Sequence, residues 1–142
     1  MVEFFKDPGT SKKINDALIK LDILYVDENS KFKVLNMEYK AVWPVANRDF
    51  VIVSVRHDDG NCHYIATKSC SYPFDEVKGV VRAELSVGGY IIEKIDEKST
   101  RVTYIANSDP KGNIPGMVKN TLASKQGGVA SKVQGIMEKE GF

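Results

Sequence analysis

The spacing of apolar residues changes after Asn107, and that change limits the folds open to this chain. From Ile19 to Asn107 apolar and polar residues largely alternate in short runs, as in strands that bury one face. From Val118 onward apolar residues recur at helical spacing, at Leu122, Val129, Val133 and Ile136. The pattern predicts an α+β fold, a curved antiparallel meander wrapped around one long C-terminal helix. Its six predicted strands are residues 19–25, 32–41, 50–56, 62–71, 80–95 and 101–107.

Turn residues separate these elements. The segment Asp58-Asp59-Gly60-Asn61 predicts a tight hairpin, and Trp43-Pro44 predicts an irregular loop. Near the start, Asp7-Pro8-Gly9 divides residues 4–16 into two short helical pieces, the second capped by Thr10 or Ser11.

Two pairs of glycines interrupt regular patterns. Gly88-Gly89 predicts a bulge that bends the fifth strand. Gly127-Gly128 predicts a kink or a loosened turn in the C-terminal helix.

Length and charge bound the class of protein. The 142 residues, 42% of them hydrophobic, fit a single domain over residues 1–142. A net charge of +1 argues against a nucleic-acid partner, because phosphate contacts need a basic excess. There is no apolar run long enough to span a bilayer and no secretion signal, and two cysteines suit a reducing compartment. We therefore expect a cytoplasmic protein.

The types and spacing of the polar residues give little support to metal binding or catalysis. His57, Cys62, His63 and Cys70 lie close in sequence, but Cys62 and Cys70 fall at opposite ends of one strand. We expect no metal site, no disulfide and no cofactor. Because no nucleophile or phosphate-binding motif is present, we expect no catalytic residue and no enzyme.

Charged residues beside apolar strands allow two interpretations. Arg48, Asp49, Arg82 and Glu84 could form a surface or an ion pair, or they could provide a buried polar anchor at the end of an apolar cavity. Arginine suits a phosphate or carboxylate because it makes bidentate hydrogen bonds. A row of lysines on the C-terminal helix, at 125, 132 and 139, fits a solvated face or an anionic membrane surface.

Four segments in order resemble one known family. Residues 39–51, YKAVWPVANRDFV, are similar to the W-P-V-x-x-R-D-F-V signature of START lipid-transfer domains. The blocks GVVRAE at 79–84, GYII at 89–92 and DPKGNIP at 109–115 follow in the order of that family. The resemblance runs from about Ile14 to Met137 and implies a helix-grip fold with a lipid tunnel between sheet and helix.

The resemblance implies non-enzymatic binding of a phospholipid or another acyl lipid, and its transfer between membranes. The loop 42–47 and the C-terminal helix would form a gate that opens during transient contact with a membrane surface. Arg48 or Arg82 would anchor the lipid headgroup. The apolar and aromatic residues expected to contact the lipid are Tyr39, Trp43, Val53, Ala83, Leu85, Tyr104, Val118 and Leu122.

The chain departs from the family pattern in two respects. The opening helix and first three strands of the family have no counterpart here, so residues 101–107 would form a free edge strand. We expect either a homodimer through that edge or a tunnel open on one side. The acidic and basic positions of sterol-binding members hold Tyr39 and Asp58 here, which favours a phosphatidylcholine-transfer-like protein.

Two other functions remain open at this stage. The chain could be a protein-interaction module that no longer transfers lipid, docking a partner through the free edge and the helix. It could also be a helix-grip enzyme, although Tyr39, Tyr104 and His63 are almost the only acid or base groups near the apolar strands.

Overall fold

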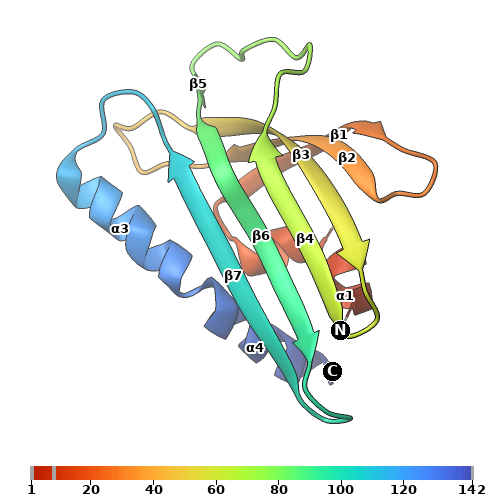
Figure 1. Cartoon of the computed structure of the whole chain (residues 1–142). Helices are drawn as coiled ribbons and strands as arrows, with labels where there is room; N and C mark the ends of the chain where they lie inside the picture. The colour runs from red at the N-terminus through yellow and green to blue at the C-terminus, as the bar shows by residue number, and fades with distance from the viewer. Residues whose placement is uncertain (1, 8, 142) are drawn as a thin grey trace.

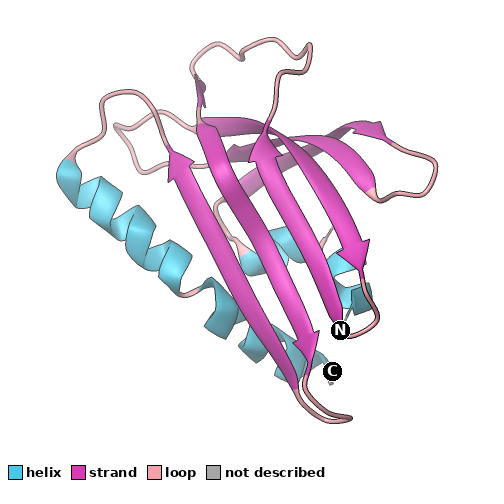
Figure 2. Cartoon of the chain, viewed as in Figure 1, coloured by secondary structure: helices cyan, strands magenta, loops and turns pink. Residues whose placement is uncertain are grey.

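A curved antiparallel sheet with helices on one face forms the protein, as the computed structural model shows (Figures 1 and 2). The structure describes residues 2–7 and 9–141. The strands pair in the order β1-β2-β3-β4-β6-β7, which confirms the predicted meander, and the two-residue β5 pairs with β3. The strands are β1 (Leu18–Val26), β2 (Phe32–Tyr39), β3 (Arg48–Asp58), β4 (Cys62–Ser69), β5 (Val81–Arg82), β6 (Glu84–Lys94) and β7 (Thr100–Asp109).

The fifth predicted strand is divided in the structure. The chain leaves the sheet after β4 and returns as β5, which runs parallel to β3 at Arg48 and Asp49. The Ala83 amide then donates a hydrogen bond to the Asp49 carbonyl before β6 begins. The sequence prediction missed this division because residues 80–86 alternate like one continuous strand.

The bulge in β6 lies at a different place from the predicted one. The register with β7 shifts between Leu85 and Val87, two residues before the glycine pair. Gly89 has a positive φ of 137°, and a Cβ there would lie 1.8 Å from the Ile65 carbonyl oxygen. Gly89 is therefore required by a close approach of two backbones rather than by the bulge itself.

Two C-terminal helices replace the single predicted one. α3 (Gly116–Gly127) and α4 (Val129–Glu140) are separated at Gly128, close to the predicted kink. α4 buries Val133 and Met137, whereas no residue of α3 is buried. α4 therefore packs into the core with the N-terminal helices and the sheet, and α3 lies beside β7 as a more exposed helix (Figure 1).

Two short N-terminal helices complete the core. α1 (Val2–Lys6) and α2 (Thr10–Ile14) contribute Phe4, Phe5 and Ile14 to a cluster with Ile92 and the buried residues of α4. The predicted cap at Thr10 or Ser11 is wrong. Gly9 occupies the cap position, and the Thr10 hydroxyl donates to the Phe4 carbonyl at 2.5 Å.

The cysteines and histidines lie at the β3–β4 hairpin and along β4. Cys62 and Cys70 are both free thiols. His63 Nδ1 lies 2.7 Å from Asp58 Oδ2 across the hairpin. In residues 2–7 and 9–141, no three His, Cys, Asp or Glu side chains gather as metal ligands, and no helix is long and apolar enough to cross a bilayer.

Candidate functional site

The two faces of the sheet have different surroundings. We call the face that packs on α1, α2 and α4 the inner face, and the opposite one the outer face. Tyr90 and Val102 define the inner face, since both pack on the buried cluster of the helices. In β3 the inner face carries Arg56, whose Nη2 donates to the Phe5 carbonyl at 2.7 Å. Because side chains alternate, Phe50, Ile52 and Ser54 share that face with Arg56.

The inner face of β1, β2 and β3 carries two apolar rows. Ile23, Leu35 and Ile52 stand opposite one another across the three strands, and Leu21, Met37 and Phe50 form the next row. Leu35, Met37 and Phe50 are only partly buried. The helices cover the hairpin end of the inner face, so these rows remain an apolar surface beyond the packed core.

Three tyrosines extend this surface. Tyr90 and Tyr104 face each other across β6 and β7 with ring centroids 5.1 Å apart, and Tyr39 packs edge-on against Phe50 at 5.7 Å. Burial raises the pKa of all three phenols, and mutual electrostatic repulsion adds to the effect for Tyr39 and Tyr90. The three hydroxyls therefore stay neutral, and each can donate or accept a hydrogen bond beside the apolar rows.

α3 approaches the sheet through one of these tyrosines. The Tyr104 hydroxyl donates to Gln126 Oε1 at 2.7 Å. Val118 is half-buried, and Leu122 is 43% exposed. The two predicted lining residues of α3 are therefore not packed into the core.

Arg48 lies at the end of the inner face, and its guanidinium group already has partners. Nε donates to the Pro110 carbonyl at 3.1 Å, Nη2 donates to the Lys111 carbonyl at 3.0 Å, and Nη1 donates to the Ala46 carbonyl. Burial lowers the pKa of Arg48, but a guanidinium group remains charged at neutral pH. Arg48 therefore holds the β2–β3 loop to the loop that precedes α3.

Arg82 lies on the outer face. Its guanidinium group grips the buried Asp49 carboxylate with Nε–Oδ1 and Nη2–Oδ2 distances of 2.8 and 3.0 Å, and Asn36 donates to the same carboxylate at 2.9 Å. The hydrogen bonds to Asp49 raise the pKa of Arg82. This is the ion pair allowed by one of the two sequence interpretations, and it turns Arg82 away from the inner face.

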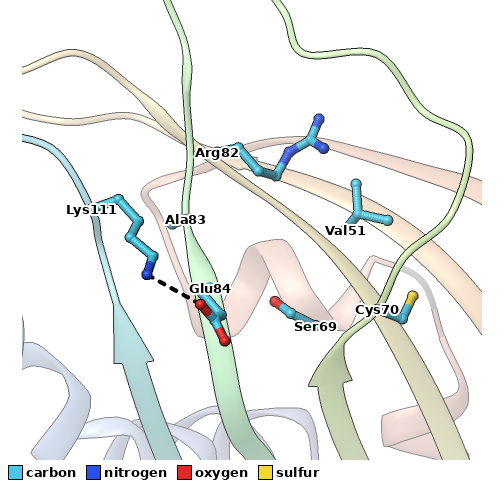
Figure 3. A pocket seen from close by; sticks show the side chains of 7 residues that line it. All are labelled: Val51, Ser69, Cys70, Arg82, Ala83, Glu84 and Lys111. Atoms are coloured by element: carbon cyan, nitrogen blue, oxygen red, sulfur yellow. Dashed lines mark ion pairs between the residues drawn. The ribbon is translucent and has the colours of Figure 1, made fainter.

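A pocket of about 270 Å³ opens beside this ion pair (Figure 3). It lies where β4 leaves the sheet and β5 takes its place next to β3. The Lys111 ammonium and the Glu84 carboxylate in its wall form an ion pair at 3.2 Å. Lys111 pairs with Glu84 and Arg82 pairs with Asp49, so each charged side chain of this pocket has a partner of opposite charge. Its lining residues are Val51, Ser69, Cys70, Arg82, Ala83, Glu84 and Lys111.

Another predicted lipid contact also lies away from the inner face. Val53 alternates with Ile52 and Ser54 in β3, so its side chain points to the outer face. The expectation that Val53 lines a tunnel is therefore corrected. Tyr39, Leu85 and Tyr104 lie on the inner face. For Leu85 the evidence is its distance from Gly88, the inner-face partner of Thr67: a Cβ added to Gly88 would lie 3.1 Å from the Leu85 side chain.

The loop between β2 and β3 presents bare apolar side chains. Trp43 is 89% exposed and Val42 is 70% exposed. Met117, at the start of α3, is 81% exposed. The β2–β3 loop and the start of α3 therefore present large apolar side chains to solvent.

Sequence reasoning did not single out Arg56. The sequence interpretation considered other charged residues beside apolar strands, namely Arg48, Asp49, Arg82 and Glu84. It treated Arg56 only as the last residue of a predicted strand. The alternation of side chains along β3 could have identified Arg56, because Arg56 lies on the same face as Ile52 and Ser54.

A sheet curved around a C-terminal helix, with an apolar space on the helix side, is the arrangement of helix-grip domains. The sequence model of the START domain matches residues 9–134. The chain belongs to the START family.

Relatives and solved structures agree with this assignment. The chain is 32% identical to human phosphatidylcholine transfer protein over 105 residues, which covers 70% of this chain and 49% of that protein. It is 35% identical to human START domain-containing protein 10 over 78 residues, which covers 54% of this chain and 27% of that protein. The chain thus spans about half, or less, of the curated relatives it matches.

Two human structures share the fold. The crystal structure of STARD10 superposes with a TM-score of 0.74 at 22% identity, covering 97% of this chain and 60% of that one. StAR-related lipid transfer protein 5 gives a TM-score of 0.74 at 16% identity, covering 92% of this chain and 67% of that one.

Proposed function

We propose that this chain binds one lipid between the inner face of the sheet and α3, and carries it between membranes. The observation that supports the proposal is the pairing of a partly uncovered apolar surface with a helix that buries none of its residues. Its relation to a protein named for phosphatidylcholine transfer points to the same class of ligand. The role is non-enzymatic, and residues 1–142 act as one lipid-binding domain.

An acyl chain along the two apolar rows would supply the affinity. Each buried CH₂ group contributes about 0.8 kcal/mol, so part of one chain is enough for useful binding. In this arrangement Tyr39, Leu85 and Tyr104 line the lipid from the sheet, and Val118 and Leu122 cover it from α3. Hydroxyl groups of the tyrosines would meet carbonyl or ester oxygens of the lipid.

In this proposal Arg48 and Arg82 stabilise the fold and do not contact the lipid headgroup. The Arg48 guanidinium group donates to three carbonyls, and that of Arg82 lies on the outer face against Asp49. Replacing either by Gln is expected to lower stability more than lipid affinity. A loss of affinity without a loss of stability would restore the headgroup role expected from the sequence.

Membrane contact would occur at the exposed tip formed by Val42, Trp43 and Met117. These three side chains lie on the β2–β3 loop and on α3, the two elements that would have to part to admit a lipid. Insertion of Trp43 into the interfacial region of a bilayer fits the preference of tryptophan for that depth. The cytoplasmic setting expected from the two cysteines stays a prediction.

The test is a transfer assay with fluorescent phosphatidylcholine moving between donor and acceptor vesicles. Met37→Glu places a charge in the inner apolar row and is expected to abolish transfer. Val55→Glu is the matched control, because Val55 is exposed on the outer face of β3. Thermal unfolding checks that both variants fold. Equal transfer by the two variants would contradict the proposal.

The alternative of a protein-interaction module is favoured by one observation, the open edge of β7. An antiparallel pairing of two β7 strands centred on Ile105 would place Arg101 of one copy opposite Asp109 of the other. Opposite charges across strands stabilise such a pairing. A homodimer of this kind is compatible with lipid binding, because the edge of the sheet and its inner face are separate surfaces.

A further inference from the structure

A second, smaller pocket lies on the inner face. It has a volume of about 60 Å³ and sits between the N-terminal segment and the strands β1, β2 and β3. The pocket therefore fits a compact polar group such as a carboxylate or a phosphate, not a whole lipid.

Arg56 in the wall of this pocket is a partly buried cation, and none of the described carboxylates pairs with it. Its only side-chain hydrogen bond in the part of the chain that the structure describes goes from Nη2 to the Phe5 carbonyl. Arg82, by contrast, holds a carboxylate with two of its nitrogens. Burial lowers the pKa of Arg56, which shows that its environment disfavours the charge. A buried charge that lacks a counterion is costly, so the site favours an anion.

The other charges around the pocket add to this preference. Lys6 from α1 and Lys33 from β2 line it together with Arg56. Among the lining residues that the structure describes, Asp7 supplies the one carboxylate, and its Oδ1 accepts a hydrogen bond from the Gly9 amide at 2.9 Å. Arg56 and Lys33, which both lie on the inner face of the strands, make the sheet side of the pocket positive.

The floor of the pocket is apolar and continues into the proposed lipid site. Leu21, Ile23 and Leu35 line it from the same strands. Leu35 belongs to one apolar row of the inner face and Leu21 to the other. A molecule with its charged end in the pocket would therefore have its tail on the apolar rows.

We infer that this pocket binds the anionic oxygens of a lipid headgroup, a carboxylate or a phosphate, with Arg56 as the main contact and Lys33 as the second. The inference rests on the proposed function and narrows it to anionic lipids. Ser54, between the two cations in the wall, offers a hydroxyl donor to the same oxygens.

The experiment compares two lipids that differ only in the phosphate group of the head. The chain is incubated with phosphatidylcholine vesicles that contain radiolabelled dioleoylphosphatidic acid or dioleoylglycerol, and the protein-bound label is counted after the vesicles are removed. We expect about tenfold more phosphatidic acid than dioleoylglycerol on the protein, the size of one charge-assisted hydrogen bond. Arg56→Gln and Lys33→Gln are each expected to reduce that ratio severalfold, and Arg56→Lys is expected to retain much of it.

Matched controls separate a lost contact from lost folding. Lys68→Gln removes an exposed cation from the outer face of β4 and is expected to leave the ratio unchanged. Circular dichroism and the melting temperature show whether Arg56→Gln folds, and Lys33→Gln tests the same site if it does not.

The outcomes distinguish this inference from the proposed function. Equal binding of both lipids to the wild-type chain would overturn the inference and leave lipid binding intact. Absence of phosphatidic acid, dioleoylglycerol and phosphatidylcholine alike would overturn both. If inorganic phosphate raises the melting temperature in an Arg56-dependent way while the two lipids bind equally, the pocket is a site for free anions and not for a lipid headgroup.

Discussion

Gly89 is the residue at which the fold tolerates a side chain least. Its φ of 137° disfavours any L-residue, and an added Cβ would collide with the Ile65 carbonyl oxygen. Gly89→Ala is expected to destabilise the protein by about 2–4 kcal/mol. Gly60→Ala is the control, since Gly60 has a φ of 92° but open space around it, and it should cost about 1 kcal/mol. Urea unfolding measures both, and equal losses would refute the close-approach argument.

Asp49 carries the buried polar network of the outer face. Removing its carboxylate leaves Arg82 and Asn36 without their shared partner, so Asp49→Ala is expected to lower the free energy of unfolding by about 3–5 kcal/mol. Glu93→Ala removes the carboxylate of an exposed pair with Arg101 and should cost less than about 1 kcal/mol. A small loss for Asp49→Ala in chemical denaturation would mean that the network adds little stability.

For individual residues, the sequence did not determine which face of β3 lies toward the helices. Residues 50–53 and Val55 are apolar, so alternation carries no information about the inner face until Ser54 and Arg56 are considered. Val53 was assigned to the wrong face for this reason. The Pro110 and Lys111 carbonyls that Arg48 contacts were also beyond prediction, because they lie 62 and 63 residues further along the sequence.

Among the elements, the β2–β3 loop carries the only tryptophan of the chain. Trp43 is therefore its own fluorescent probe. If the loop inserts into membranes, phosphatidylcholine vesicles should shift the Trp43 emission to shorter wavelength, because the indole leaves water. Trp43→Ala should slow vesicle-to-vesicle lipid transfer severalfold. An unshifted emission spectrum at saturating vesicles would argue against insertion of this loop.

The edge strand β7 could pair with a second copy of the chain. Ile105 is 42% exposed on a strand whose second edge is unpaired within the sheet. If two copies pair through this edge, light scattering should give a dimer mass for the wild-type chain, and Arg101→Asp should shift it toward monomer by facing Asp109 of the other copy. The double change Arg101→Asp with Asp109→Arg should restore the dimer. A monomeric wild-type chain would leave the edge without this role.

Element prediction succeeded where a local signal is strong. The hairpin at Asp59 and Gly60, the interruption at Gly128 and the strand order all follow from turn residues and periodicity. Two features needed the whole structure. β5 forms because the loop after β4 folds back on β3, and α3 stays exposed because an amphipathic pattern does not say whether its apolar side finds a partner.

For the whole molecule, the uncovered apolar surface is the central feature. α1, α2 and α4 fill the hairpin end of the inner face, and the rows that include Leu35 and Met37 remain without a complete cover. Such a surface is stabilised when a ligand covers it, and a ligand that binds the folded state raises the melting temperature by mass action. The proposed function follows from this surface, because a bound lipid would cover it; the chain belongs to the START family.

Native mass spectrometry of the chain after incubation with mixed-lipid vesicles tests that account most directly. We expect each chain to carry one lipid, which is released on denaturation and recovered in an organic extract of the same sample. Arg56→Gln should shift the recovered lipid from anionic to neutral species while the stoichiometry stays at one. A folded wild-type chain that shows only its own mass, with no lipid in the extract, would contradict the account.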